Sequence, residues 1–248
     1  MIVFVTGATA GFGAAITRKF VAEGHQVIAA GRRADRLEAL AKELGSAVLP
    51  FTLDVTDRAA TEAVASRLPA TFAAVDVLVN NAGLALGLEP AQKADLDDWE
   101  TMIETNVKGL TRMTRSLLPG MVERGRGHIV NLGSVAGQFP YPGGNVYGAT
   151  KAFVDQFSLN LRADLLGTPV RVTNVEPGLC GGTEFSSVRF KGDDEKAAKI
   201  YDGTQPLTSE DIAETVFWVT ARPPHVNINS IQMMPVCQAF GPLAIKRG

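Results

Sequence analysis

The chain has 248 residues, of which 46% are hydrophobic, and a formal net charge of −2 at pH 7. This length and apolar content are typical of one large α/β domain, so we expect a single domain over residues 1–248. The near-neutral charge excludes a basic field for nucleic acid and a polybasic membrane patch. No apolar run reaches the roughly 18 residues that a membrane span needs.

The two cysteines, Cys180 and Cys237, indicate a reducing compartment and no disulfide framework. The apolar N-terminus lacks a preceding basic region and runs directly into glycines, so it predicts a strand rather than a signal peptide. Three scattered histidines predict no metal site. We therefore expect a cytoplasmic protein without a metal.

Apolar runs alternate with helical patterns along the whole chain. The first run, residues 2–5, is continuous and β-branched, as expected of a strand buried on both faces. The alternation predicts a parallel sheet of about seven strands with helices on both faces, a three-layer doubly wound α/β (Rossmann) fold. Strands are expected near 2–5, 26–30, 47–53, 75–80, 128–132, 170–175 and 230–234, and helices near 12–23, 33–44, 57–68, 97–124, 145–165 and 208–220.

A glycine-rich loop follows the first predicted strand and reads Thr6-Gly7-Ala8-Thr9-Ala10-Gly11-Phe12-Gly13. Glycines in such a loop permit a tight turn and let the backbone approach a pyrophosphate at the N-terminus of the next helix. The spacing differs from the usual G-x-G-x-x-G, and no G-K-[ST] closes the loop as in a Walker motif. The loop predicts a dinucleotide site; a glycine-rich turn without a ligand is the alternative.

The end of the second predicted strand, Gly31-Arg32-Arg33, bears on the choice of nicotinamide cofactor. NAD-specific sites place an acid about 20 residues beyond the glycine loop, on the ribose 2′-hydroxyl. Here the nearest acid, Asp35, already lies in the next predicted helix. Two arginines at a helix N-terminus are electrostatically misplaced unless an anion is present. The pattern predicts that Arg32 and Arg33 hold the 2′-phosphate of NADP, and two solvated arginines are the alternative.

Ser134, Tyr147 and Lys151 form the candidate catalytic set. Four residues make about one helical turn, so Tyr147 and Lys151 project from the same face. A free phenol has a pKa of about 10 and is a poor proton donor or acceptor at pH 7, but a neighbouring ammonium favours its ionised form. A Y-x-x-x-K spacing alone is a weak signal, whereas together with the dinucleotide loop it predicts general acid–base chemistry.

The motifs fall at the ends of successive predicted strands, where an open α/β sheet binds its ligand. Among them are Asn80-Asn81-Ala82-Gly83, Ser134 and Pro177-Gly178, whereas Asn106 and Tyr147-x-x-x-Lys151 lie in the predicted helices between the strands. With the T-G-x-x-x-G-x-G loop they occur in the order and spacing of the short-chain dehydrogenase/reductase family, which the chain resembles over its whole length. Stretches such as Gly143-Gly144-Asn145-Val146-Tyr147 and Gly181-Gly182-Thr183-Glu184-Phe185-Ser186 extend the resemblance to bacterial NADP-dependent 3-hydroxy acid dehydrogenases.

The resemblance implies hydride transfer between NADP and a small 3-hydroxy acid (L-serine, L-allo-threonine or 3-hydroxypropanoate), with Tyr147 as general acid and base. Lys151 would lower the pKa of Tyr147 and bond the nicotinamide ribose. Ser134 would hold the substrate oxygen, and Asn106 would anchor a water in a proton relay; local bonding within its helix is the alternative for Asn106. Two other functions stay open: a reductase for another carbonyl substrate (ketoacyl thioester, sugar or steroid), and a dinucleotide sensor without catalysis.

The resemblance also implies which residues bind the cofactor. Asp54 and Val55 would flank the adenine, Asn81 would contact the nicotinamide side, and residues 177–185 would bind the nicotinamide amide and the phosphates. The full expected set is Gly7, Ala8, Thr9, Ala10, Gly11, Phe12, Gly13, Arg32, Arg33, Asp54, Val55, Asn81, Tyr147, Lys151, Pro177, Gly178, Leu179, Thr183, Glu184 and Phe185.

Residues 179–206 are polar and lie where the family carries its substrate-covering loop. A carboxylate substrate needs a cation near Tyr147 and Ser134, and this segment offers Arg189 and Lys191. We prefer Arg189, because a planar guanidinium can hold a carboxylate with two parallel hydrogen bonds. The expected substrate-binding residues are therefore Ser134, Tyr147 and Arg189; a solvated loop arginine is the alternative.

The predicted helix 145–165 also bears on assembly. We expect one apolar face, formed by Phe153, Phe157, Leu161 and Leu165, to pack on the sheet. Small residues on the other side would let a second helix approach closely, and the predicted helix 97–124 is apolar around its girth. The family uses these two helices in a dimer interface, so we expect a homotetramer, with ordinary surface alanines as the alternative.

Overall fold

The computed structural model describes residues 1–240; residues 241–248, which the single-domain expectation also includes, lie outside the described residues. Within residues 1–240, seven parallel strands form one sheet in the order β3-β2-β1-β4-β5-β6-β7. The predicted fold class is confirmed. The strands are β1 (Ile2–Thr6), β2 (Gln26–Gly31), β3 (Val48–Thr52), β4 (Val77–Asn80), β5 (Gly127–Leu132), β6 (Val170–Pro177) and β7 (Ser230–Met233).

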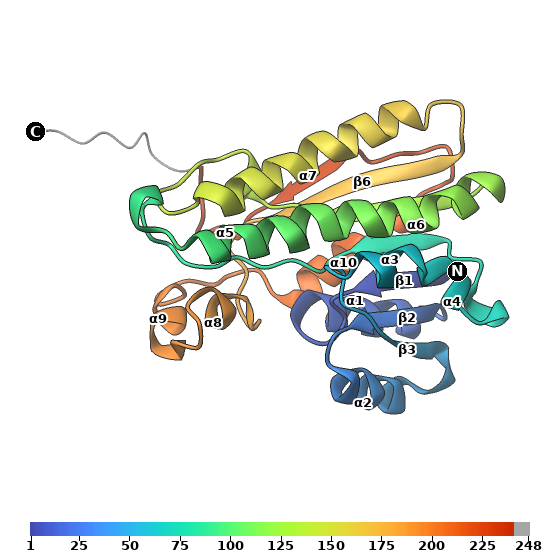
Figure 1. Ribbon diagram of the computed structural model, residues 1–248, viewed down its shortest axis with the longest axis horizontal. Coiled ribbons are helices and arrows are strands. Elements are labelled where there is room, and N and C mark those ends of the chain that lie inside the picture. Colours follow the sequence, from blue (N-terminus) through green and yellow to red (C-terminus); the bar gives the residue numbers. More distant parts are fainter. Residues whose placement is uncertain (241–248) are drawn as a thin grey trace, which may run out of the picture.

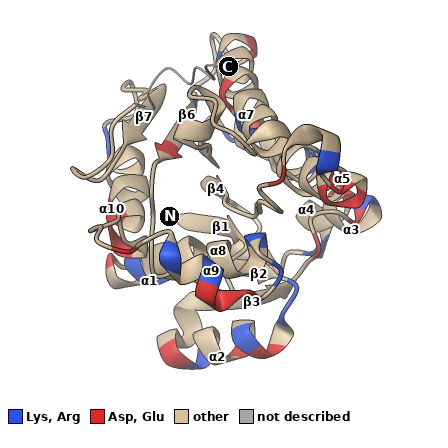
Figure 2. Ribbon diagram, turned by 90° about the vertical axis from the view of Figure 1, so that its left-hand side faces the viewer, with Lys and Arg blue, Asp and Glu red and all other residues tan. Residues whose placement is uncertain are grey.

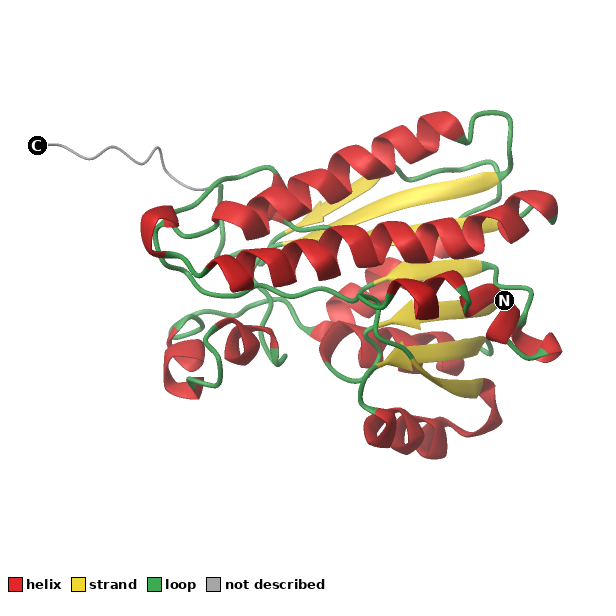
Figure 3. Cartoon of the chain, in the orientation of Figure 1, coloured by secondary structure: helices red, strands yellow, loops and turns green. Residues whose placement is uncertain are grey.

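Helices cover both faces of the sheet, as Figure 3 shows. One face packs against α1 (Gly11–Ala22), α2 (Ala34–Leu44) and α10 (Ser209–Thr220). The other packs against α3 (Arg58–Glu62), α4 (Val64–Arg67), α6 (Leu110–Glu123) and α7 (Asn145–Asp164). Further short elements are α5 (Leu96–Ile103), α8 (Phe185–Arg189), α9 (Asp194–Lys199) and the 3₁₀ turns η1 (Gly45–Ala47), η2 (Ala70–Phe72), η3 (Ala91–Lys93) and η5 (Val135–Gly137).

The central strand β1 explains why its sequence is apolar without alternation. Successive side chains of a strand point to opposite faces of the sheet. Val3 and Val5 pack among the side chains of α1 and α10, whereas Phe4 packs among those of α6 on the other face. All three are fully buried, so both faces need apolar residues.

Two predicted helices are interrupted. The predicted helix 57–68 is divided into α3 and α4, and the Thr61 hydroxyl donates to the carbonyls of Asp57 and Arg58. Such side-chain bonds compete with the helical pattern. The predicted helix 97–124 contains a π-helical turn, η4 (Glu104–Gly109), between α5 and α6.

The prediction of which side of α7 faces the sheet is partly wrong. Phe153 is 37% exposed and stacks on Phe157, with ring centres 5.7 Å apart. The buried side of the helix carries Tyr147, Lys151 and Val154 instead. Residues spaced three and four apart share a helix face, so turning Tyr147 and Lys151 inward turns Phe153 outward.

The carboxyl ends of the strands share one edge of the sheet. Strand order runs in opposite directions on the two sides of the boundary between β1 and β4, and such a switch point leaves a crevice for a ligand. Figure 1 shows α8 and α9 beyond this edge. The 179–206 segment, expected as a loop, thus contains two short helices and lies next to the crevice.

Candidate active site

A cavity of about 680 Å³ occupies the carboxyl edge of the sheet. Figure 2 looks onto this edge, with α8 and α9 projecting over the ends of the strands. All of the predicted site residues line the cavity except Ala8, Gly13 and Asn106, which are buried behind it. The motifs therefore converge on one site.

The glycine loop forms a backbone cradle at the start of α1. Gly7 and Gly11 have positive φ angles of 68° and 49°, a conformation that other residues rarely adopt. A Cβ atom at Gly13 would lie 2.2 Å from the carbonyl oxygen of Gly7. The Asn81 amide braces the loop by donating to the carbonyls of Thr6 (2.8 Å) and Gly7 (3.2 Å). The cradle fits the pyrophosphate of a dinucleotide.

Arginines line the cavity at the start of α2. Arg33 donates twice to the Thr9 hydroxyl, at 3.1 and 2.7 Å, and once to Glu184 at 2.8 Å. Arg36 binds the same carboxylate at 2.6 Å. Arg32 lines the cavity, and its side chain makes no hydrogen bond or ion pair within residues 1–240. A guanidinium without a partner beside the cradle fits the extra phosphate of NADP.

Asp54 and Val55 line the cavity near these arginines. Asp54 accepts hydrogen bonds from the backbone and the hydroxyl of Thr56, at 2.9 and 2.8 Å. These bonds hold the turn after β3 in place. The position is compatible with the expected adenine contact, which stays a prediction.

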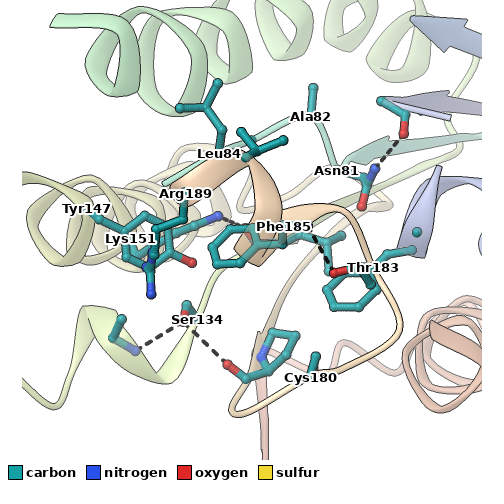
Figure 4. A pocket seen from close by; sticks show the side chains of 18 of the residues that line it. Asn81, Ala82, Leu84, Ser134, Tyr147, Lys151, Cys180, Thr183, Phe185 and Arg189 are labelled. Carbon is teal, nitrogen blue, oxygen red and sulfur yellow. Dashed lines mark hydrogen bonds between the residues drawn. The ribbon is translucent and has the colours of Figure 1, made fainter. Parts of the chain in front are cut away.

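Tyr147 and Lys151 extend from the first two turns of α7 into the cavity (Figure 4). Lys151 Nζ lies 5.8 Å from the centre of the Tyr147 ring and donates to the carbonyl of Leu132 at 2.7 Å. Both side chains are largely buried. Because burial removes water from the ammonium, it lowers the pKa of Lys151 to about 8.

Burial has the opposite effect on the phenol and raises the pKa of Tyr147 to about 12. The Ser134 hydroxyl and the charge of Arg189 oppose this increase. Tyr147 is therefore protonated at neutral pH and can donate a proton. The lowering of its pKa by Lys151 stays a prediction, since that ammonium points to a main-chain carbonyl.

Ser134 lies at the end of β5 with a weakly held hydroxyl. Its oxygen accepts from the backbone N–H of Ala136 at 3.1 Å and donates to the carbonyl of Pro177 at 3.4 Å. The second distance is long for a hydroxyl donor. The proton of Ser134 is thus free to turn toward a ligand oxygen in the cavity.

Arg189 stands over the Tyr147 ring. Its guanidinium carbon lies 5.1 Å from the centre of that ring and 5.0 Å from the centre of Phe185. It donates to the Tyr141 hydroxyl at 3.1 Å, and its Nε is buried without a partner in the described chain. Lys191, the other candidate cation, instead pairs with Asp98 at 2.9 Å. Of the two, Arg189 is the cation that faces the candidate catalytic residues (Figure 4).

Asn106 lies in the π-helical turn η4 and not in the cavity lining. Its side chain accepts from the backbone N–H of Leu84 at 2.9 Å and donates to the carbonyl of Leu84 (2.8 Å) and to Thr150 (3.0 Å). These bonds tie the loop after β4 to α7. π-Helical turns are common at functional sites, and here the turn presents Asn106 to both elements. Both N–H groups of the amide already have protein partners, and a water relay through Asn106 stays a prediction.

A comparison with known families matches residues 1–194 to the short chain dehydrogenase family. This chain belongs to the short-chain dehydrogenase family. The resemblance inferred from its motifs is confirmed.

Relatives of this short-chain dehydrogenase match it over its full length. NADP-dependent 3-hydroxy acid dehydrogenase YdfG of Salmonella typhi is 68% identical over 247 residues, covering 100% of both chains. Serine 3-dehydrogenase of Agrobacterium fabrum is 53% identical and covers 99% of this chain and 98% of its own. The solved closed form of serine dehydrogenase complexed with NADP⁺ matches 100% of both chains with a TM-score of 0.99 at 63% identity. Serine dehydrogenase from Escherichia coli has a TM-score of 0.87 at 58% identity, over 97% and 100% of the chains.

Three features of this dehydrogenase were not predicted from sequence. Arg36 joins the arginine cluster; its spacing of three from Arg33 on a helix could have indicated this. Tyr141 bonds Arg189 from a loop rich in glycine and proline, where no motif marks it. Gln238, far along the chain, accepts from the backbone N–H of Leu179 at 2.7 Å and lines the cavity. No local signal could have found that contact.

The buried ammonium of Lys151 predicts a pH-dependent stability. Its pKa falls from the ordinary 10.5 to about 8 on folding. Between about pH 8 and pH 10.5 the unfolded state therefore binds more protons than the folded state, and the free energy of unfolding rises with pH. We expect the difference in unfolding free energy between wild type and Lys151→Met, measured with urea, to shift in favour of wild type by about 2 kcal/mol from pH 7 to about 9.5. A difference that does not change with pH would show that Lys151 is not desolvated.

Proposed function

We propose that this protein interconverts small 3-hydroxy acids, such as L-serine, L-allo-threonine and 3-hydroxypropanoate, and their 3-oxo acids. One observation carries the proposal: Tyr147, Ser134 and the cation of Arg189 face one cavity whose other end is a dinucleotide cradle. The names of the relatives, a 3-hydroxy acid dehydrogenase and a serine 3-dehydrogenase, support this substrate class. The cofactor is NADP, as in the 3-hydroxy acid dehydrogenase relative and in the matched serine dehydrogenase structure.

The glycine cradle and Arg32 would hold the cofactor at its phosphates, with Asn81 bracing the cradle. When bound, the nicotinamide ring accepts or supplies the hydride. The protein contributes position and proton transfer. Because burial keeps the Tyr147 phenol protonated, it donates its proton to the substrate oxygen in reduction. Oxidation is the reverse: after the phenol has released its proton to solvent, the phenolate takes the proton of the substrate hydroxyl. The loosely held Ser134 hydroxyl orients the same oxygen.

The choice between NADP⁺ and NAD⁺ tests the role proposed for Arg32. We expect NADP⁺ to be preferred over NAD⁺ with L-serine, and Arg32→Gln to raise the KM for NADP⁺ about tenfold or more with little change for NAD⁺, because the lost contact is a charge-assisted one to phosphate. Arg58→Gln removes an exposed arginine of α3 that pairs with Glu62 and controls for net charge. Equal effects of Arg32→Gln on both cofactors would contradict the assignment.

Removal of the phenolic oxygen tests the proton donor. We expect Tyr147→Phe to bind NADPH like wild type and to lower kcat for L-serine oxidation by about 10²–10⁴-fold, the usual contribution of general acid–base catalysis. Cofactor binding is measured by fluorescence titration and kcat by steady-state kinetics. A variant that keeps more than about a tenth of the wild-type turnover would exclude Tyr147 from this role.

A comparison of charged with uncharged substrates tests whether Arg189 binds the substrate carboxylate. Arg189→Met keeps much of the apolar contact with Tyr147 and Phe185 but loses the guanidinium that would bind the substrate carboxylate. We expect its KM for L-serine to rise about tenfold or more, as for a lost bidentate ion pair, while activity on an uncharged ketone is retained. Lys191→Met is the matched control, since Lys191 faces Asp98. Equal losses on charged and uncharged substrates would show that Arg189 instead holds the segment together.

We also propose that the protein assembles as a homotetramer in the cytoplasm. Phe153 and Leu159 are exposed apolar residues of α7, as are Ile103 of α5 and Val122 of α6. Their burial between copies would remove an exposed apolar surface. Cys180 and Cys237 are free thiols, consistent with a reducing compartment. Within residues 1–240, no helix has the length and apolar character of a membrane span.

Light scattering tests the assembly. At micromolar concentration we expect a mass of about four chains for wild type, as for the closed tetramer proposed above. Leu159→Glu places a charge on the exposed side of α7 and should shift the protein to a smaller species. A wild-type mass of one chain would contradict the proposal.

A further inference from the structure

Ion pairs fasten the 179–206 segment at two places, on opposite sides of the cavity. On one side, Glu184 accepts from Arg33 at 2.8 Å and from Arg36 at 2.6 Å, both near the N-terminus of α2. On the other, Lys191 pairs with Asp98 at 2.9 Å and Asp95 at 3.4 Å, at the N-terminus of α5. No other ion pair within residues 1–240 joins this segment to the rest of the chain.

The first fastening connects the two ends of the proposed site. Glu184 is the residue before α8 and Arg189 is the last residue of that helix. One short helix therefore links the carboxylate held by α2 to the guanidinium that stands over Tyr147. Fixing Glu184 in place limits the positions that Arg189 can take.

The charges around Glu184 give its contact with Arg33 and Arg36 a second role. Arg32, Arg33 and Arg36 place three positive charges beside the dinucleotide cradle, and within residues 1–240 Glu184 is the one carboxylate that pairs with them, through Arg33 and Arg36. The bond to Arg36 holds the pKa of Glu184 below its usual range. A phosphate brought to these arginines would thus meet an ionised carboxylate that uses the same donors.

We propose that Glu184 is a positioning residue that latches the 179–206 segment onto Arg33 and Arg36, the arginines next to the proposed 2′-phosphate site. The latch holds the segment closed over the cavity. At the same time the negative charge of Glu184 opposes binding of the 2′-phosphate beside Arg33 and Arg36. Closure of the segment and selectivity for NADP therefore depend on the same charged residues. The inference rests on the proposed NADP-dependent function.

Two variants on opposite sides of the latch separate these effects. Glu184→Gln removes the ion pairs with both Arg33 and Arg36, whereas Arg36→Gln removes one and leaves the pair with Arg33, so both should loosen the segment and Glu184→Gln should loosen it more. Their effects on a bound phosphate should have opposite signs, because one variant removes a negative charge and the other removes a positive charge. Lys191→Met breaks only the other fastening and leaves the arginine cluster unchanged.

The closure arm uses limited trypsin digestion without cofactor, with cleavage after Lys196 and Lys199 of α9 followed by mass spectrometry. We expect cleavage to accelerate about two- to fivefold in both Glu184→Gln and Arg36→Gln, as for loss of partly exposed ion pairs, and in Lys191→Met as well. Equal unfolding midpoints would establish that the three variants fold normally. Cleavage at the wild-type rate in Glu184→Gln would overturn the latch.

The charge arm compares the affinities of adenosine 2′,5′-bisphosphate and adenosine 5′-monophosphate by calorimetry, which requires no turnover. We expect the preference for the bisphosphate to increase about two- to fivefold in Glu184→Gln, to decrease by a similar factor in Arg36→Gln, and to stay unchanged in Lys191→Met. A decrease in Glu184→Gln would overturn the proposed charge coupling. A wild-type protein without any preference would instead contradict the NADP assignment, while the digestion would still report on the latch.

Discussion

Each central strand of the sheet is covered by helices on both sides, and this double burial determines where chemistry can take place. The side chains of Val3, Phe4 and Val5 are fully buried, so neither face of the sheet at β1 can receive a ligand. The strand ends remain accessible, and because all strands are parallel their carboxyl ends share one edge. The loops that carry the glycines, the arginines and Ser134 leave the sheet at that edge and enclose the cavity.

Exclusion of water then sets the chemistry of the groups in the cavity. The same burial raises the pKa of Tyr147 and lowers that of Lys151, because in each case the charged form loses its hydration. The result is a protonated Tyr147 phenol beside a Lys151 ammonium that loses its proton more readily than an exposed lysine. A buried ammonium destabilises the fold, which is a common property of functional sites. The charge of Arg189, which opposes the increase in the pKa of Tyr147, comes from the 179–206 segment and not from α7.

The 179–206 segment therefore takes part at both ends of the cavity. Glu184 binds the arginines of the proposed cofactor end, while Arg189 faces Tyr147 at the proposed substrate end. The short helix α8 joins them, so only a few residues separate the two ends. Under the proposed function, this segment would link cofactor and substrate recognition through ion pairs that are partly exposed and individually weak.

The sequence by itself determined the features that depend on near neighbours along the chain. Strand and helix positions, the glycine loop, Arg32 and Arg33 at a helix start, and the one-turn spacing of Tyr147 and Lys151 follow from local periodicity, which made the fold and the main parts of the site predictable. Only the tertiary structure decided the pairing of Glu184 with Arg33, 151 positions apart, the contact of Tyr141 with Arg189, and the outward position of Phe153. These contacts arise where loops from different strands converge, and convergence depends on how the whole sheet is ordered and covered rather than on any local pattern.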